Sequence, residues 1–336
     1  MSVSTMNRHL LRADAGRTID PAPPESHSRM NAAIEFCLRA STNVPALQAV
    51  ADWWPRWKST AATRATPIEQ AIAGGFDADR VGWAFASGYQ AALRALVPDL
   101  PEGSLVALCV TEEAGNRPRD IRTTFSTQAD GGVSISGSKR WTTLGPDSTL
   151  LLIVGALEGA GTRPALKVAR VATNAPGVTL HAMPETRFVP EVPHASVSLN
   201  DVRVGADALL PGDGYEACVK PFRTIEDIHV TVAVLAYLLR EARQRDWPVA
   251  FSEQLVAAMT LLADLACGDA GAASVHVALA GALRWVDALY AEASAHWASA
   301  ADDAGAVRWH RDAKLFEVAS AARRQRPAKA WERLRG

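Results

Sequence analysis

The chain has 336 residues, of which 48% are hydrophobic and 21% are charged, and its formal net charge is −1. This length exceeds one ordinary hydrophobic core and predicts two or three domains. The near-neutral charge argues against a nucleic-acid-binding protein, and the 4 scattered cysteines lack the paired spacing of a zinc site or disulfide framework. No apolar run predicts a membrane span or a secretory leader, so we expect a cytoplasmic protein without a metal site.

The first part of the chain is predicted to be a disordered tail followed by a helical domain. Residues 1–28 combine prolines, serines and mixed charge, a composition typical of disorder. Residues 30–60 and 67–98 show the apolar spacing of helices, and prolines end the second segment. Together these segments form a predicted N-terminal domain over residues 29–102.

The middle of the chain, over residues 103–208, changes to short alternating segments broken by glycines. Its most informative stretch runs from Leu105 to Leu144. Alternation with a period of two residues, punctuated by glycine, predicts consecutive antiparallel strands. Trp141 and Thr143 are two residues apart on one such strand, so their side chains are expected on the same face. A flat aromatic ring beside a hydroxyl suits a planar ligand with hydrogen-bonding edges.

The last part of the chain, residues 209–336, is rich in alanine, leucine and arginine. The predicted helices are residues 225–243, 252–267, 272–298 and a shorter segment after Val307. Short connections between them predict an antiparallel four-helix bundle. The predicted order is therefore helical, then β, then helical again, which is an α+β multidomain arrangement.

The central residues resemble the middle domain of the acyl-CoA dehydrogenase family. That family carries, in order, a Thr-Glu loop, an Ile-x-Thr strand and a Gly-x-Lys-x-Trp-Ile-Thr strand. The matching residues are Thr111, Glu112, Ile121, Thr123, Gly137, Lys139, Trp141, Thr143 and Gly145. Later matches are Ser196–Val204, Leu209–Gly214 and, more faintly, Arg311–Lys314. The resemblance implies a helical N-terminal domain, a central β-barrel-like domain and a C-terminal four-helix bundle.

The resemblance also implies a site for FAD. In the family, the Trp packs against the isoalloxazine ring, the Thr of the same strand bonds its pyrimidine side, and the Thr of the loop binds the ring from below. By position, the cofactor-binding residues are Leu108, Val110, Thr111, Asn116, Trp141 and Thr143. The alternative interpretation makes Trp141 an ordinary half-buried strand residue and the threonines simple β-formers.

The loop after Glu112 departs from the family pattern. Family members carry Gly-Ala-Gly-Ser-Asp there, and its backbone amides and Ser approach the flavin phosphates and the acyl-CoA. This chain has a single glycine in the loop, with Asn116 in place of the Ser and with Arg117 and Arg119 as donors for phosphate. A solvated surface turn is the competing interpretation.

The chain matches the family pattern least well at the position of the catalytic base. Acyl-CoA dehydrogenation needs a carboxylate that removes the α-proton while the flavin accepts the β-hydride. In most family members this Glu falls where the present chain has Ser320 or a close neighbour. Some members place it on the first long C-terminal helix, where Glu226 matches and Asp227 lies beside it, so both are predicted catalytic residues. The structural alternative is that Thr224 caps a helix whose first-turn acids favour the helix dipole.

Two further family signatures are missing. The Arg-x-x-Phe-Gly segment, which meets the FAD diphosphate of a neighbouring subunit, appears only as Arg243–Pro248. The Gln-x-x-Gly-Gly-x-Gly segment, which holds the adenine end, is not visible between Ala291 and Val307.

The sequence therefore leaves more than one function open. The first is an FAD-dependent, acyl-CoA dehydrogenase-like oxidoreductase acting on an acyl thioester or a related small molecule. The resemblance then implies an electron-transfer flavoprotein as redox partner and a dimer or tetramer of identical chains. The others are a catalytically degenerate accessory or assembly protein of the same fold, and a flavin-dependent oxygenase that lacks the usual base.

Overall fold

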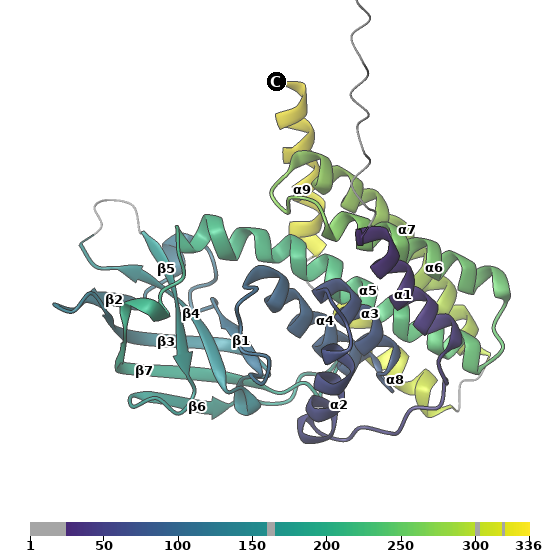
Figure 1. The fold of residues 1–336 in the computed structure, drawn as a ribbon, viewed down its shortest axis with the longest axis horizontal. Helices are drawn as coiled ribbons and strands as arrows, with labels where there is room; N and C mark the ends of the chain where they lie inside the picture. Colours follow the sequence, from purple (N-terminus) through teal and green to yellow (C-terminus); the bar gives the residue numbers. More distant parts are fainter. Residues whose placement is uncertain (1–24, 160–164, 300–302, 318–319) are drawn as a thin grey trace, which may run out of the picture.

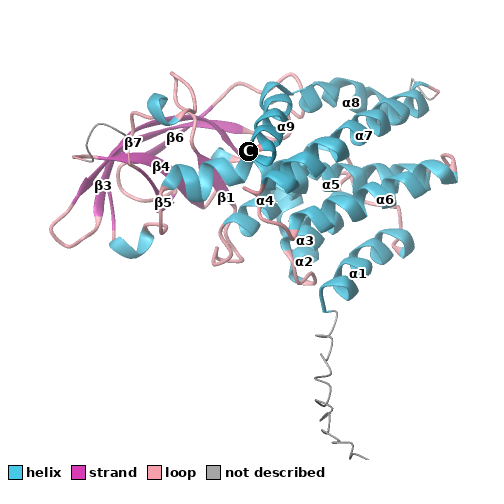
Figure 2. Cartoon of the chain, turned by 90° about the horizontal axis from the view of Figure 1, so that it is seen from above, coloured by secondary structure: helices cyan, strands magenta, loops and turns pink. Residues whose placement is uncertain are grey.

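The computed structural model describes residues 25–159, 165–299, 303–317 and 320–336 (Figure 1). The predicted disordered tail lies outside these ranges, apart from residues 25–28, which belong to the first helix. A sheet occupies one end of the molecule and helices occupy the other, as two perpendicular views show (Figures 1 and 2).

The helices before the sheet are α1 (Glu25–Arg39), α2 (Val50–Ala62), α3 (Pro67–Phe76) and α4 (Val81–Leu96). The segments predicted to be helical over residues 30–60 and 67–98 are therefore two helices each. Turn-forming residues and Pro45 interrupt the first segment, and a turn over residues 77–80 interrupts the second. A reciprocal cap starts α3. The Thr66 hydroxyl accepts from Glu69 N–H at 3.4 Å, and the Glu69 carboxylate accepts from Thr66 N–H at 3.0 Å.

The strands are β1 (Val106–Cys109), β2 (Thr124–Thr127), β3 (Val133–Thr143), β4 (Leu150–Leu157), β5 (Leu166–Ala172), β6 (Val178–Ala182) and β7 (His194–Val204). They form one sheet in the order β1-β4-β2-β3-β7-β6, with β5 paired to β4. The predicted antiparallel pairing holds for β2 with β3. In contrast, β4 pairs in parallel with both β1 and β2, so the sheet is mixed.

Strand β1 is buried on both faces, which explains its continuous apolar run. Val106 and Leu108 belong to the core cluster shared with the helices, whereas Ala107 and Cys109 belong to a second cluster on the other face of the sheet. Successive side chains of a strand point to opposite faces. Leu108 is thereby directed toward the helices.

The helices after the sheet are α5 (Lys220–Gln244), α6 (Val249–Ala266), α7 (Ala273–Ala298), α8 (Ala304–Asp312) and α9 (Ser320–Arg335). The first four correspond to the predicted bundle helices. Helix α9 was not predicted, because its arginine-rich sequence with an internal Pro327 lacks an apolar periodicity.

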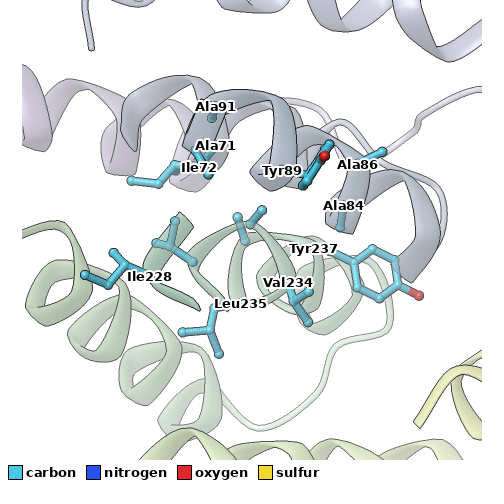
Figure 3. Close-up of a cluster of buried hydrophobic side chains, with 14 of the residues drawn as sticks. Ala71, Ile72, Ala84, Ala86, Tyr89, Ala91, Ile228, Val234, Leu235 and Tyr237 are labelled. Atoms are coloured by element: carbon cyan, nitrogen blue, oxygen red, sulfur yellow. The ribbon is translucent and has the colours of Figure 1, made fainter. Parts of the chain in front are cut away.

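Helix α5 is the central helix of the fold and packs against α3 and α4 (Figure 3). Two glycines set the distance between these helices. A Cβ added to Gly75 would lie 2.1 Å from the Ala233 carbonyl oxygen, and one added to Gly88 would lie 2.6 Å from Val230 Cα. Because both contacts are with backbone atoms, larger residues would force the helices apart.

Helix α6 is long and apolar enough, by length and composition alone, to cross a membrane, with a mean hydropathy of 1.4 over 18 residues. This is weak evidence, since core helices pass the same test. The side chains of Phe251, Leu255 and Met259 are fully buried among the other helices.

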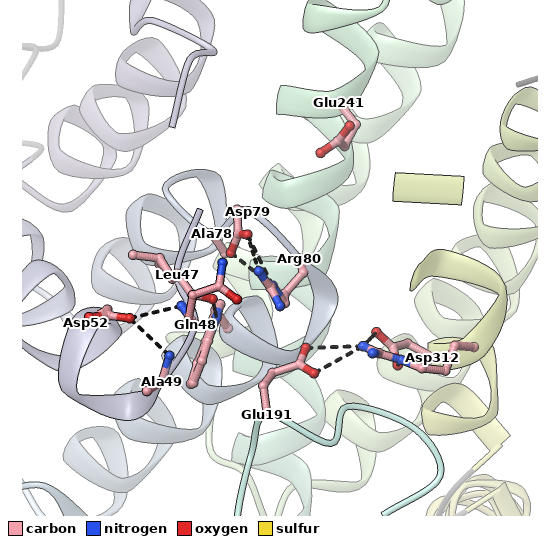
Figure 4. Close-up of polar contacts among 12 residues, drawn as sticks. Leu47, Gln48, Ala49, Asp52, Ala78, Asp79, Arg80, Glu191, Glu241 and Asp312 are labelled. Atoms are coloured by element: carbon pink, nitrogen blue, oxygen red, sulfur yellow. Dashed lines mark hydrogen bonds and ion pairs between the residues drawn. The ribbon is translucent and has the colours of Figure 1, made fainter. Parts of the chain in front are cut away.

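Polar contacts between Glu191 and the end of α8 at Asp312 join α8 to the segment that precedes β7 (Figure 4). The buried Asp312 carboxylate accepts a hydrogen bond from Val189 N–H at 2.7 Å. Beside it, the Arg311 guanidinium lies 3.1 Å from the Glu191 carboxylate. The faint sequence match at Arg311–Lys314 thus includes a connection between α8 and the segment that precedes β7.

Candidate functional site

A cavity of about 160 Å³ lies where α4, the sheet and α5 meet. All six predicted cofactor-binding residues line it: Leu108, Val110, Thr111, Asn116, Trp141 and Thr143. Glu226, the predicted base, lines the same cavity from α5. We call this space the wall cavity. The structure thus brings together residues that are 118 positions apart in the sequence, between Leu108 and Glu226.

Trp141 reaches the wall cavity through an irregularity in its strand. The pairing of β3 with β7 shifts between Lys139 and Thr142, and Trp141 has a φ of 59°. An extra residue of this kind is a β-bulge, which redirects side chains. Trp141 is 49% exposed, and its ring meets His194 edge-on at 6.1 Å between centroids. Trp141 and Thr143 share the cavity as predicted, but through a bulge rather than through regular alternation.

A buried ion pair holds the Thr111 loop against the strand that carries Trp141. The Lys139 ammonium lies 2.6 Å from the Glu112 carboxylate, which also accepts hydrogen bonds from the N–H and hydroxyl groups of Thr123. Burial raises the pKa of Glu112, but Lys139 and the surrounding donors outweigh it and hold the pKa below its usual value. The sequence matched both residues to the family without revealing that they pair.

Tyr89 and Phe222 form the helical side of the wall cavity, and neither was predicted there. The Tyr89 hydroxyl accepts a hydrogen bond from Leu108 N–H at 3.0 Å, which ties α4 to β1. Its ring meets Phe222 edge-on at 6.0 Å between centroids. Burial raises the pKa of Tyr89, so its phenol stays neutral. Helical apolar spacing places both residues on an inner face but does not distinguish a cavity from a core.

Glu226 also lines a second cavity of about 100 Å³, to which Trp141 does not contribute. We call it the inner cavity. Its apolar lining comes from α4, α5, α7 and the segment after α8, and consists of Phe85, Val230, Val234, Leu283, Val286, Leu315 and Phe316. Its other lining residues, besides Glu226, are Asp227, Thr231, Asp287, Tyr290 and Arg323. Burial, reinforced by the charge of Asp227, raises the pKa of Glu226 to about 7. A carboxyl group that titrates near neutrality suits general-base catalysis.

Asp227, the other predicted catalytic residue, has a different environment. Its carboxylate lies 2.8 Å from Arg323 and 2.7 Å from Arg326, both on α9, and it does not line the wall cavity. Asp227 lines the inner cavity together with Glu226, but only Glu226 of the two also lines the wall cavity. The geometry does not support the catalytic prediction for Asp227. Its contacts instead hold α9 against α5.

The capping interpretation of Glu226 and Asp227 is also wrong. Helix α5 begins at Lys220 and is preceded by a π-helical turn, Tyr215–Val219, so Thr224 lies inside the helix. Farther along, His229 is buried, and its Nδ1–H donates to the Ile225 carbonyl at 2.8 Å. Burial lowers the pKa of His229 to about 4, which makes it a neutral structural residue.

The arginines of the Arg243–Pro248 segment are engaged within the chain. Arg243 donates to the carbonyl oxygens of Cys37 and Ala40. Arg245 pairs with Glu241 at 2.8 Å and with Asp303 at 3.0 Å.

The loop arginines named as phosphate donors are elsewhere. Arg117 and Arg119 are exposed and do not line the wall cavity. Of the residues in this loop, Thr111 and Asn116 line the wall cavity.

Solved structures of the same architecture were found. Butyryl-CoA dehydrogenase from Megasphaera elsdenii has a TM-score of 0.65 at 14% identity, covering 93% of this chain and 99% of that chain. FMN-bound TdsC from Paenibacillus sp. A11-2 has a TM-score of 0.67 at 15% identity, covering 91% and 97%. The FAD complex of PigA has a TM-score of 0.67 at 13% identity, covering 94% and 100%.

No family model and no curated protein sequence matches this chain. The similarity lies in structure, with the helical, β and helical parts in the predicted order. The chain has the acyl-CoA dehydrogenase fold.

Proposed function

We propose that the protein is a flavin-dependent oxidoreductase that introduces an α,β double bond into an acyl thioester or a related activated carbonyl compound. The observation that carries this proposal is the convergence of six predicted cofactor-binding residues and Glu226 on the wall cavity. Similar structures that contain FAD or FMN support a flavin, with FAD as the expected form.

The residues of the wall cavity fit a flavin ring. The exposed Trp141 side chain offers a face for stacking against a planar heterocycle. The hydroxyls of Thr111 and Thr143 and the amide of Asn116 offer donors and acceptors for its polar edge. The Glu112–Lys139 pair fixes the loop and the strand on which these groups depend.

Glu226 is the proposed base. Its carboxylate would remove a proton from the carbon next to the thioester carbonyl, and the electron pair left behind would form the double bond. The bound flavin would supply the acceptor for the hydride that leaves the neighbouring carbon. The apolar residues of the inner cavity, which Glu226 also lines, would hold the apolar end of the substrate away from water.

The first test is the visible spectrum of the protein after incubation with FAD and desalting. We expect flavin bands that survive desalting and that bleach when acyl-CoA is added without oxygen. Glu226→Gln should keep the bands and slow the bleaching by about 10²- to 10⁴-fold, the usual contribution of a general base. Glu253→Gln, which removes an exposed carboxylate of α6, should change neither.

The outcomes separate the parts of this proposal. A protein that stays colourless with FAD and with FMN contradicts the flavin site. A coloured Glu226→Gln variant that bleaches as fast as the wild type contradicts the assignment of the base.

A second candidate function is a non-catalytic accessory or assembly protein of this fold. It is favoured by the contacts of Arg243 and Arg245, which direct both guanidinium groups to partners within the chain. A colourless protein would support it. A coloured protein that is inert to thioesters but reacts with oxygen after chemical reduction would support a flavin-dependent oxygenase.

The proposed enzyme also needs a partner that accepts its electrons. We propose an electron-transfer flavoprotein for this role, a cytoplasmic location and a dimer or tetramer of identical chains. Light scattering of the purified protein measures the assembly, and flavin reoxidation with and without the partner measures the electron transfer.

A further inference from the structure

A third cavity, of about 420 Å³, lies at the start of α5. The α6–α7 loop and the middle of α9 form its other sides. Arg223 lines both this space and the wall cavity, so the two are neighbours along the same helix. We call it the basic cavity.

Basic side chains dominate the lining of this cavity. They are Lys220, Arg223, Arg326, Lys329 and Arg333, with Glu216 and Asp269 as the acidic residues. Lys220 pairs with Glu216 at 2.6 Å, and Arg326 pairs with Asp227 at 2.7 Å. In the described part of the chain, no ion pair within 4.0 Å involves Arg223, Lys329 or Arg333. A concave surface with uncompensated positive charge attracts anions.

The shape and the polar groups of the basic cavity favour a phosphate ester over a small anion. Its volume is far larger than a single carboxylate or halide requires. The cations come from two helices, α5 and α9, so a ligand must present several acceptor oxygens to meet them together. The Thr224 hydroxyl and the His276 ring, 3.3 Å apart, add neutral polar groups to the lining.

We propose that the basic cavity binds a phosphate ester carried by one of the two molecules that meet at the wall cavity. The phosphate belongs either to the carrier group of the substrate or to the flavin. This inference deepens the proposed function and rests on it for the identity of the ligand. The phosphate would lie in the basic cavity, on the side of Lys329 and Arg333 away from Glu226. The reacting carbon would lie at Glu226, and the apolar tail at Val230 and Val234.

The test compares the wild-type chain with the double variant Lys329→Gln/Arg333→Gln by calorimetry. Adenosine 3′,5′-bisphosphate is the first probe, because it has phosphate esters but neither a flavin nor a thioester. We expect it to bind the wild type, and to bind the variant at least about tenfold more weakly, since two charge-assisted contacts are lost. Both substituted residues are exposed, so the fold should survive.

A matched control removes the same charge elsewhere. The double variant Lys314→Gln/Arg335→Gln also loses two exposed cations, and neither residue lines the basic cavity. It should bind the bisphosphate as tightly as the wild type.

Two pairs of probes then identify the source of the phosphate. CoA is compared with pantetheine, and FMN with riboflavin, in the wild type and in both variants. If the cavity variant weakens CoA and not FMN, the phosphate belongs to the substrate carrier; the reverse result assigns it to the flavin. Either result supports the site.

Two other results overturn the inference. One is a cavity variant that binds every phosphorylated probe as the wild type does. The other is a control variant that loses as much affinity as the cavity variant. In contrast, a protein that binds the bisphosphate but retains neither FAD nor FMN would support the phosphate site and contradict the proposed function.

Discussion

The Glu226 carboxyl lies between two cavities, and burial raises its pKa to about 7. A base acts in its ionised form, so a raised pKa means that a higher pH is needed before most of the protein carries an active base. We expect the rate of thioester-dependent flavin reduction to rise with pH through about 7 and to level off above about 8. Stopped-flow reduction across this range measures it. A rate that is constant across the range, or that falls as the pH rises, contradicts a base with this pKa.

Trp141 is the residue that most directly tests the cofactor prediction, because its 49% exposed ring contributes little to the core. Loss of a stacking aromatic ring weakens the binding of planar bases by about 1–3 kcal/mol. We therefore expect Trp141→Ala to raise the dissociation constant of the flavin by about 5- to 150-fold, and Trp141→Phe to raise it less. Flavin fluorescence titration measures both. Equal affinities in all three proteins would mean that Trp141 only packs on the strand.

At the scale of elements, the packing of α4 on α5 depends on Gly88. An added Cβ would meet the backbone of Val230, which cannot move aside as a flexible side chain would. We expect Gly88→Ala to lower the free energy of unfolding by about 1–3 kcal/mol. Gly281→Ala on α7 is the matched control, because nothing lies within 4 Å of its added Cβ. There the substitution should be neutral or stabilising by up to about 1 kcal/mol. Urea denaturation gives both values, and equal effects would contradict the close contact.

The elements also show what periodicity can and cannot predict. Glycine-punctuated alternation located the strands, and apolar helical spacing located most helices. It missed α9, whose arginines bind Asp227 and line cavities rather than filling a core. It also placed Trp141 on a regular strand, because a bulge depends on how β7 pairs with β3 and has no local sequence pattern.

The site was predictable only where residues match a known order. The six cofactor-binding positions came from such a match, and they lie together in the structure. Tyr89 and Arg223 carried no comparable signal, because their place depends on how α4 and α5 meet the sheet. Asp227 was assigned with Glu226 because they are adjacent in sequence, but its carboxylate pairs with Arg323 and Arg326 and does not line the wall cavity.

At the scale of the whole molecule, Asp312 connects the helical end to the segment before β7. Its carboxylate is buried, accepts from Val189 N–H and pairs with Arg311. Asp312→Ala removes the acceptor of the buried Val189 N–H, and leaving a buried donor unsatisfied costs about 1–3 kcal/mol, so the free energy of unfolding should fall by about that amount. The Val189 amide should also exchange hydrogen faster.

The control for this prediction is Asp264→Ala, which removes an exposed carboxylate from α6. It should leave the exchange of the Val189 amide unchanged. Denaturant titration and hydrogen exchange measure the two effects, and an unchanged Val189 amide in Asp312→Ala would contradict the connection.

Helix α5 lines all three cavities, through Arg223, Glu226 and Val234 among others. A helix rises about 1.5 Å per residue, so Arg223 and Val234 are about 16 Å apart along its axis. Glycine contacts lock this helix against its neighbours, which prevents the spacing from adjusting to the ligand. The helix therefore fixes the distances between the residues that line the three cavities. It would select molecules by the length between their charged group and their apolar end, and would reject ligands that carry the same groups at another separation.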